Sequence, residues 1–347
     1  MYFQMGLSAG WFHHFPLKMI TEIQDSIFNI RTKADFWAAT LSVFKYQYYN
    51  NKVYKEFVSL LGRKLISVKT LSDILFLPVE FFRNHKIISG VKPVEAIFES
   101  SGTTGVIPGK HFVSDLKLYE TSFEKSFTLF YGDPRDYLII ALLPSYTERE
   151  GSSLVYMAAN LIKKSHHPGS GFYKGNTDAF LKAMKKGKEE GSKILLLGVS
   201  FALLDLAESE SPDLSGVIIM ETGGMKGRRK ELTRSELHSI LKDKLNVTTI
   251  HSEYGMTELL SQAYSRGDGI FYCPPWMKVI LRDPQDPLTL FTEPARTGGI
   301  NIIDLANMNS CSFISTGDLG KIQEDGGFEV LGRFDNSDIR GCNLMME

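Results

Sequence analysis

The sequence predicts an α/β fold in which a parallel sheet is covered by helices on both faces and is followed by a small β-rich subdomain. Apolar runs without polar alternation are typical of strands buried on both faces, and stretches with helical periodicity separate these runs. Beyond about residue 268 the helical pattern ends, and short strands alternate with Gly and Pro turns. The expected parallel strands are residues 137–143, 193–199, 217–220 and 247–251, and the expected helices between them are residues 152–163, 177–190 and 231–245.

The region that precedes this sheet is predicted to be helical. Leu17, Ile20, Ile23 and Ile27 recur at helical spacing, and aromatic residues are frequent in the stretch that follows. We expect the aromatic rings to pack the helices onto the core, with a share in an apolar substrate channel as the alternative. The chain therefore divides into a helical region (1–90), an α/β core (91–267), a β-rich subdomain (268–331) and a hinge-like tail (332–347).

The composition favours a globular protein and excludes several classes of partner. Of the 347 residues, 43% are hydrophobic and 23% are charged, and the formal net charge is −1. Without a basic face or tail, nucleic acid is not an expected partner. No apolar run reaches the ~18–20 residues that cross a bilayer, so no membrane span is expected. The three cysteines form neither a CxxC pair nor an even disulfide framework, and no secretory signal is present, so we expect a cytoplasmic protein.

A loop of small hydroxyl residues and glycines is the strongest single indication of chemistry. Ser100-Ser101-Gly102-Thr103-Thr104-Gly105 follows an apolar stretch and leads to Lys110. Backbone N–H groups in such a loop can bind phosphate oxygens, the hydroxyls add donors, and Lys110 can reach the outer phosphates as a point charge. The usual ATPase loop needs glycine where Thr104 stands and Ser or Thr where His111 stands. A Walker-type ATPase is therefore not predicted.

Two further loops are expected at one edge of the parallel sheet. Residues 221–227 follow the third expected strand and contain Gly223, Gly224 and Met225, and residues 252–258 follow the fourth. Because ligands of parallel α/β sheets bind beyond the carboxyl ends of the strands, these two loops should meet at one place.

Four short motifs occur in a recognisable order. They are Ser100 to Gly105, Tyr254-Gly255-Met256-Thr257-Glu258, Ser315-Thr316-Gly317-Asp318 and Gly332-Arg333. In order and rough spacing they resemble the motifs of adenylate-forming enzymes, the superfamily of acyl-CoA synthetases, peptide-synthetase adenylation domains and firefly luciferase. Each motif alone is weakly specific, whereas four in this order over about 230 residues are strongly specific. The resemblance covers roughly residues 90–341 and implies the large N-terminal-type core of those enzymes.

The resemblance implies an ATP- and Mg²⁺-dependent enzyme and a role for each motif residue. A hard cation prefers carboxylate oxygen, one carboxylate suits a vicinal diol, and positive charge offsets the charge of the departing pyrophosphate. The implied site of the β- and γ-phosphates is Ser100, Ser101, Gly102, Thr103, Thr104 and Gly105, with Lys110 reaching the outer phosphates. The implied adenine pocket is formed by Gly223, Gly224 and Met225, with Tyr254 and Gly255 beside the base. The resemblance further implies that Thr257 touches the α-phosphate, that Glu258 binds Mg²⁺, and that Asp318 accepts the ribose hydroxyls with Arg333 nearby.

The end of the chain departs from most of that superfamily. Most members continue past the Arg/Gly hinge motif into a mobile lid domain, whereas this chain stops at Glu347. We expect the lid to be absent, because the chain is either truncated or belongs to a branch that works without it. The acyl-protein synthetases of bacterial luminescence are similarly short, and the chain resembles them most. In that family the acyl group passes to a cysteine near the C-terminus, which implies Cys342 as nucleophile, with Arg340 favouring its thiolate.

The sequence thus predicts an acid–thiol ligase that activates a carboxylic acid as an acyl-adenylate and then transfers the acyl group to Cys342. A fatty acid is favoured by the aromatic-rich helices and by the family, since each buried methylene contributes ~0.8 kcal/mol. An acyl reductase or an acyl carrier is the expected partner. The alternatives are an acyl- or aryl-CoA or carrier-protein ligase, and a nucleotide-binding module without catalysis. Cys273 and Cys311 are expected to be packing residues.

Overall fold

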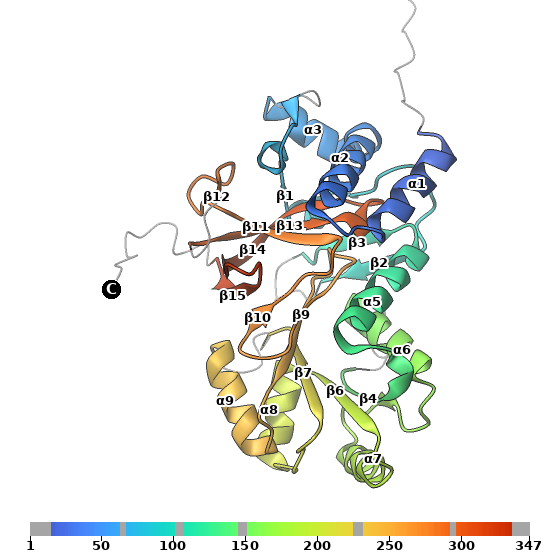
Figure 1. The fold of residues 1–347 in the computed structure, drawn as a ribbon, viewed down its shortest axis with the longest axis vertical. Helices are drawn as coiled ribbons and strands as arrows, with labels where there is room; N and C mark the ends of the chain where they lie inside the picture. Colours follow the sequence, from blue (N-terminus) through green and yellow to red (C-terminus); the bar gives the residue numbers. More distant parts are fainter. Residues whose placement is uncertain are drawn as a thin grey trace, which may run out of the picture.

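The computed structural model describes residues 15–62, 67–100, 107–144, 151–224, 232–291 and 296–334. Two lobes lie one above the other in an elongated molecule (Figure 1). The lower lobe holds a mostly parallel sheet, and the upper lobe holds a second sheet beneath the N-terminal helices. Within the described ranges, no helix is both long enough and apolar enough to cross a membrane.

The sheet of the lower lobe has six strands in the order β5-β4-β6-β7-β8-β9. Strands β4 to β8 pair in parallel, and β9 adds an antiparallel edge. Every residue of β4 is buried, as is every residue of β6 except Lys193, which explains the apolar runs in the sequence. The strands are β4 (Tyr137–Leu142), β5 (Gly171–Phe172), β6 (Lys193–Val199), β7 (Ile218–Thr222), β8 (His251–Tyr254) and β9 (Ala263–Ser265).

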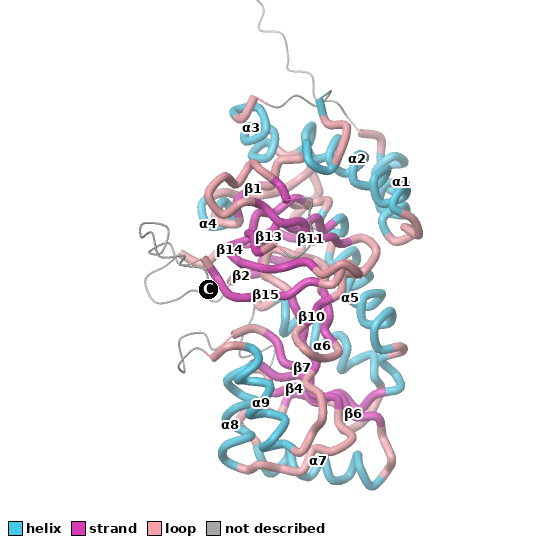
Figure 2. Tube along the Cα trace, turned by 60° about the vertical axis from the view of Figure 1, so that its left-hand side comes forward, coloured by secondary structure: helices cyan, strands magenta, loops and turns pink. Residues whose placement is uncertain are grey.

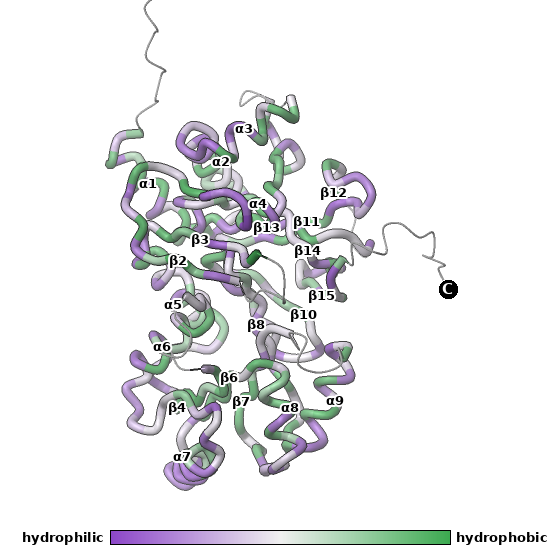
Figure 3. The backbone as a smooth tube through the Cα atoms, turned by 180° about the vertical axis from the view of Figure 1, so that it is seen from behind, coloured by the Kyte–Doolittle hydropathy of each residue, from purple (hydrophilic) through white to green (hydrophobic). Residues whose placement is uncertain are grey.

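Helices pack on both sides of this sheet, so the predicted α/β arrangement is confirmed. In Figures 1 and 2, α8 and α9 lie side by side on one side, and α5 and α6 lie on the other. The side chains of Lys182, Lys185, Lys186 and Lys188 on helix α7 are exposed, and Figure 3 colours much of this helix as hydrophilic. The helices are α5 (Leu116–Tyr131), α6 (Ser153–Ser165), α7 (Thr177–Glu189), α8 (Ser200–Ser209) and α9 (Arg234–Leu245).

The sheet of the upper lobe has seven strands, of which β10-β15-β14-β13-β11-β12 form a continuous antiparallel path. Strand β1 pairs in parallel with β14, so residues 77–78, from the expected helical region, join this sheet. A separate hairpin of β2 and β3 carries the flanks of the hydroxyl-rich loop. The strands are β1 (Leu77–Pro78), β2 (Ala96–Glu99), β3 (Lys110–Val113), β10 (Ile270–Phe271), β11 (Met277–Arg282), β12 (Leu290–Phe291), β13 (Thr297–Asp304), β14 (Phe313–Ile322) and β15 (Phe328–Arg333).

The N-terminal helices cover the upper sheet through aromatic contacts. The rings of Phe44 and Tyr54 lie 5.9 and 5.8 Å from the ring of Phe313 on β14, which confirms packing as the role of these two rings. A capping box of Thr32 and Asp35 starts α2. The helical elements are α1 (Leu17–Ile27), α2 (Lys33–Asn50), α3 (Lys52–Leu60) and α4 (Phe81–Asn84), with short 3₁₀ turns η2 (Leu71–Asp73), η3 (Pro134–Asp136) and η4 (Leu305–Asn307).

Three motifs that the sequence analysis treated as loops begin inside strands. Strand β8 spans His251–Tyr254 and not residues 247–251, and β7 runs to Thr222 and so contains the first two residues of the loop expected at 221–227. Strand β14 contains the whole of Ser315-Thr316-Gly317-Asp318. The β-branched residues before His251 have high strand propensity, but the ladder with β7 begins only at the pair Met220–His251. Pairing with a neighbour therefore overrides local propensity.

Gly320 provides a test of the packing around β14. The register between β14 and β15 shifts at Leu319–Gly320, and a Cβ atom on Gly320 would lie 2.6 Å from the backbone oxygen of Glu329. We expect Gly320→Ala to lower the free energy of unfolding by about 1–3 kcal/mol, because the backbone must shift. The control is Gly317→Ala in the same strand, where a Cβ meets no atom within 4 Å. Urea unfolding measures both, and equal stabilities would contradict the prediction.

Candidate active site

The hydroxyl-rich loop is closed at its base by β2 and β3. Of the predicted phosphate-binding residues, only Ser100 is described, and Ser101, Gly102, Thr103, Thr104 and Gly105 lie outside the described residues. The hydroxyl of Ser100 accepts a hydrogen bond from the Gly109 N–H at 2.8 Å, and the Ser100 N–H donates to the Gly109 carbonyl at 2.9 Å. Lys110 Nζ lies 3.2 Å from Glu99 Oε1, and both side chains are about half exposed. Such a surface pair contributes little energy, so Lys110 can exchange this partner for a phosphate.

Glu258 lies directly against the base of this loop. A Cβ atom on Gly109 would stand 2.6 Å from Glu258 Oε1 and 3.4 Å from the Ser100 hydroxyl, so only glycine allows this approach. The side chain of Glu258 belongs to a residue that is 6% exposed, and burial raises the pKa of the carboxyl group. The structure therefore brings Glu258 beside Gly109 and Ser100, from which it stands far apart in the sequence.

Magnesium fits this arrangement as an ion shared with phosphate. Among the described residues, no group of three or more His, Cys, Asp or Glu side chains could hold a metal ion by itself. Mg²⁺ commonly binds through one or two carboxylates together with substrate phosphates and water. One buried carboxylate beside a hydroxyl is such a donor set, and Glu258 is the residue that would hold the ion.

A second polar cluster joins the two lobes. The Tyr254 hydroxyl donates to Asp318 Oδ2 at 2.8 Å, and Arg333 Nε donates to Asp318 Oδ1 at 3.3 Å across the β14–β15 ladder. The Asp318 N–H donates to the Thr316 hydroxyl at 3.1 Å, and Arg282 holds the Thr316 carbonyl at 2.6 Å. The structure thus gathers three predicted site residues, and it adds Arg282, which the sequence gave no reason to select.

The ring of Tyr254 is part of the core between the lobes. It meets the rings of Phe271 and Phe328 at 5.9 and 5.6 Å, both edge-on. Its hydroxyl therefore reaches Asp318 from a fixed ring. We expected this ring beside the adenine base; in the structure, it is 8% exposed and fixes the side chain of Asp318.

The glycine-rich loop follows β7, as predicted. Gly223 has φ +73°, which favours glycine, and a Cβ on Gly224 would meet no atom within 4 Å, so this backbone is open to a flat ligand. Met225 lies outside the described residues. The Ser200 hydroxyl lies 3.0 Å from the Gly223 carbonyl and 3.1 Å from the buried carboxylate of Glu221. Glu221 could have been selected from the sequence, because it is a charged residue directly after an apolar strand.

Arg234 ties this loop to the upper lobe. Its guanidinium group donates to Glu221 Oε1 at 3.2 Å and to the carbonyl of Val330 on β15 at 3.0 Å, and it lies over the ring of Phe271 at 4.8 Å. One side chain therefore holds together β7, which leads into the glycine-rich loop, and β15, which ends at Arg333.

The stretch after Tyr254 is buried without regular structure. Thr257 and Glu258 are followed by Leu259 to Gln262, each at most 4% exposed and none in a helix or strand. Asp304 accepts from the N–H groups of Leu260 and Ser261 at 2.7 and 3.0 Å. Asp304, His111 and Asn307 hold this stretch, and all three were missed in the sequence because their partners are distant in the chain.

The described cysteines are packing residues, in agreement with the sequence analysis. Burial raises the pKa of Cys273 and of Cys311 to about 12, so neither is a thiolate at neutral pH. The thiol of Cys311 donates to the Phe313 carbonyl at 3.4 Å. Cys342 lies outside the described residues.

Comparison with solved structures identifies the fold. The chain resembles ATP-bound MatB from Rhodopseudomonas palustris with a TM-score of 0.53 and 19% identity, over 70% of this chain and 49% of that chain. It resembles the luciferase-like enzyme of the nonluminescent mealworm Zophobas morio with a TM-score of 0.51 and 15% identity, over 72% of this chain and 59% of that chain. The chain spans about half the length of the first of these proteins. The fold is that of adenylate-forming enzymes, as the four motifs predict.

Comparison of sequences points to one branch of that fold. No family model matches the chain. It is 24% identical over 328 residues to the long-chain-fatty-acid–luciferin-component ligase of Vibrio harveyi, which covers 87% of this chain and 85% of that protein. This similarity confirms the resemblance to the luminescence-associated acyl-protein synthetases.

Two buried tyrosines allow a test of how much the hydrogen bond of Tyr254 contributes to stability. We expect Tyr254→Phe to lower the free energy of unfolding by about 1.5–3 kcal/mol, because the variant loses the hydrogen bond that the Tyr254 hydroxyl donates to the charged carboxylate of Asp318. The control is Tyr264→Phe, since the buried Tyr264 hydroxyl has no hydrogen-bond partner among the described residues and its removal should be neutral or stabilising. Denaturant unfolding at pH 7 measures both, and a reversed order of stability would refute this assignment.

Proposed function

We propose that this chain is an ATP- and Mg²⁺-dependent ligase that joins a carboxylic acid to AMP and releases pyrophosphate. The observation that carries the proposal is the buried carboxylate of Glu258, set against Gly109 and the hydroxyl of Ser100 at the base of the hydroxyl-rich loop. A cation that also binds phosphate would supply the positive charge that favours a buried carboxylate at the base of this loop. The fold of ATP-bound MatB supports the same conclusion.

The reaction follows from where the charged groups lie. The substrate carboxylate attacks the α-phosphorus of ATP, the bond from that phosphorus to the bridging oxygen breaks, and pyrophosphate leaves. Lys110 and the loop that begins at Ser100 would hold the outer phosphates, Thr257 the α-phosphate, and Asp318 the ribose hydroxyls. When bound to Glu258, magnesium would supply positive charge for the departing pyrophosphate. Gly224 would offer open backbone to the adenine ring, with Gly223 beside it.

A long-chain fatty acid is the proposed substrate. The relative from Vibrio harveyi is a long-chain-fatty-acid ligase, and its similarity extends over most of both chains. Each methylene of such a chain that becomes buried on binding would contribute ~0.8 kcal/mol.

Glu258→Gln tests the adenylation step. We expect the variant to keep its fold and to lose pyrophosphate–ATP exchange by about 100-fold or more, because the amide cannot replace the charge that binds the cation. The control is Glu324→Gln, a substitution in an exposed turn that should leave exchange unchanged. Exchange is measured with tetradecanoic acid and Mg-ATP. Undiminished exchange in Glu258→Gln would remove Glu258 from the metal site.

The proposed second step transfers the acyl group to Cys342. The thiolate attacks the carbonyl carbon of the acyl-adenylate, the carbon–oxygen bond to AMP breaks, and AMP leaves as the thioester forms. Support comes from the relative in bacterial luminescence and from the raised pKa values of Cys273 and Cys311, which exclude these two thiols as nucleophiles at neutral pH. An acyl reductase or an acyl carrier would then receive the acyl group.

Intact mass measured after incubation with Mg-ATP and tetradecanoic acid tests this transfer. We expect the unmodified protein to gain one acyl group that hydroxylamine removes, because a thioester forms. Cys342→Ser should show no gain while pyrophosphate exchange persists, and Cys273→Ser should behave as the unmodified protein. Exchange without any adduct would favour a CoA or carrier-protein ligase, and ATP binding without exchange would indicate a module without catalysis.

A further inference from the structure

The carbonyl groups of Thr257 and Glu258 are held by side chains from other parts of the chain. His111 Nδ1 lies 2.8 Å from the Thr257 carbonyl, and Asn307 Nδ2 donates to the Glu258 carbonyl at 2.7 Å. His111 Nε2 in turn lies 3.0 Å from Asn307 Oδ1, so the two side chains contact each other as well as this backbone. Because this buried stretch belongs to no helix or strand, its backbone groups depend on such partners.

The orientation of Asn307 is fixed by its surroundings. Its amide nitrogen donates both to the Glu258 carbonyl and to the Cys311 carbonyl, at 2.7 and 2.8 Å. A flipped amide would set oxygen against both carbonyl groups, so Oδ1 must face His111. The turn that carries Asn307 is itself anchored, since Gln47 on α2 donates to the Met308 carbonyl at 2.9 Å.

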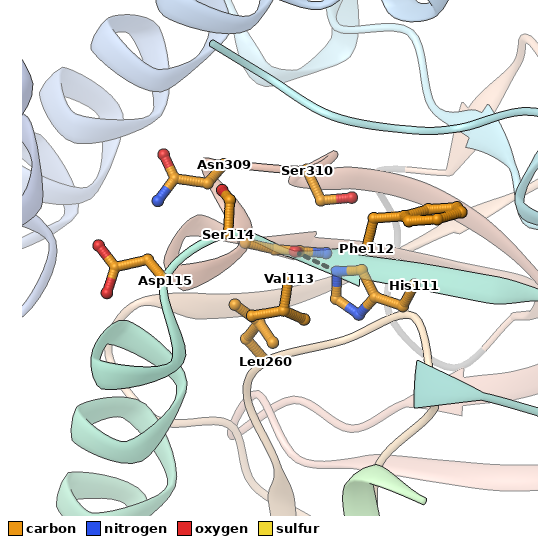
Figure 4. A pocket seen from close by; sticks show the side chains of 9 residues that line it. His111, Phe112, Val113, Ser114, Asp115, Leu260, Asn309 and Ser310 are labelled. Atoms are coloured by element: carbon orange, nitrogen blue, oxygen red, sulfur yellow. Dashed lines mark hydrogen bonds between the residues drawn. The ribbon is translucent and has the colours of Figure 1, made fainter. Parts of the chain in front are cut away.

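His111 cannot reach a substrate from this position. It is fully buried, and the ring of Phe82 meets it edge-on at 5.7 Å. Figure 4 shows His111 pointing inward from β3 beside Leu260, next to a small cavity that Asn309 and Ser310 close on the other side. Burial lowers the pKa of the imidazole to about 4, so the ring is neutral at pH 7 and carries a single N–H. It can therefore donate to only one of the two oxygens that face it, the Thr257 carbonyl or Asn307 Oδ1. The shorter contact, to the Thr257 carbonyl, is the stronger hydrogen-bond candidate of the two.

Strand β3 connects this pair of side chains, through His111, to the hydroxyl-rich loop. His111 stands two residues after Gly109, whose Cα faces the Glu258 carboxylate, and one residue after Lys110. One short strand therefore sets the base of the loop and the backbone of Thr257 at the same time. A shift of β3 relative to this backbone would move the carboxylate of Glu258 away from the loop.

We propose that His111, together with Asn307, is a positioning residue that fixes the backbone of Thr257 and Glu258 against the phosphate-binding loop. This inference rests on the proposed function of that site, and it assigns the hydrogen bond from Nδ1 to the Thr257 carbonyl as the contact that matters most. Small displacements of groups around a reacting centre are costly for the rate, and binding energy for ATP comes largely from other contacts.

The test compares three variants of the full chain. In His111→Asn the side-chain amide can take the place of Nδ1 and donate to the Thr257 carbonyl, whereas His111→Leu removes the donor. The control is Tyr54→Phe, which removes a buried hydrogen bond to the Leu75 carbonyl at 2.7 Å, far from the site. Each variant is assayed for pyrophosphate–ATP exchange with tetradecanoic acid, and amide hydrogen exchange by mass spectrometry is followed in the peptide that contains residues 257–262.

We expect kcat to fall by about 100-fold in His111→Leu with KM for Mg-ATP changed by less than about threefold, and to fall by less than about tenfold in His111→Asn. Tyr54→Phe should keep its kcat. Faster amide exchange in residues 257–262 is expected for His111→Leu alone. The positioning role is overturned if His111→Leu keeps its kcat, if His111→Asn restores nothing, or if amide exchange in this peptide matches that of Tyr54→Phe. An unmodified protein without pyrophosphate exchange would refute the proposed function, and amide exchange would still decide whether His111 fixes this backbone.

Discussion

The structure depends on one joint, the place where the end of β8 meets the upper sheet. The two main sheets share no strand, and they are joined by side chains and by a backbone bridge between Tyr264 and Tyr272. Tyr254, the last residue of β8, packs its ring against Phe271 and Phe328 and bonds its hydroxyl to Asp318. Arg234 adds a second link from α9 to β15 through the Val330 carbonyl. Because the carboxyl ends of parallel strands are where ligands bind, we expect the site at the joint between the lobes.

This joint determines how chemistry is distributed along the chain. The lower lobe contributes loops at strand ends, such as the one at Gly224, where a Cβ atom would meet no described atom within 4 Å. The upper lobe contributes Asp318 from within a strand, where the ladder to Arg333 fixes it. Neither lobe alone carries both kinds of group, so a nucleotide that touched all of them would lie across the joint. A ligand held in this way would also hold the lobes in one relative position.

The sequence predicted the parts of the site that lie in local patterns and missed those made by distant contacts. Apolar runs revealed β4 and β6, and the order of four short motifs revealed the superfamily. His111 was noticed only as a residue that breaks the ATPase pattern, because its partner Asn307 lies 196 positions away along the chain. Such a pair has no periodicity or spacing that a single sequence can display. The start of β8 was misplaced for the same reason, since pairing with β7 decides it.

The two acidic residues of the site differ in their surroundings, and this difference indicates what each can bind. Asp318 already accepts hydrogen bonds from Tyr254 and Arg333, so its charge is compensated, and in the proposed function it would also accept the ribose hydroxyls. Glu258 has no ion pair with any side chain in the described part of the chain, and burial raises its pKa. A buried carboxylate in such a position is costly until a cation arrives. The protein therefore accepts a local loss of stability at Glu258, and a bound cation with its phosphates would recover it.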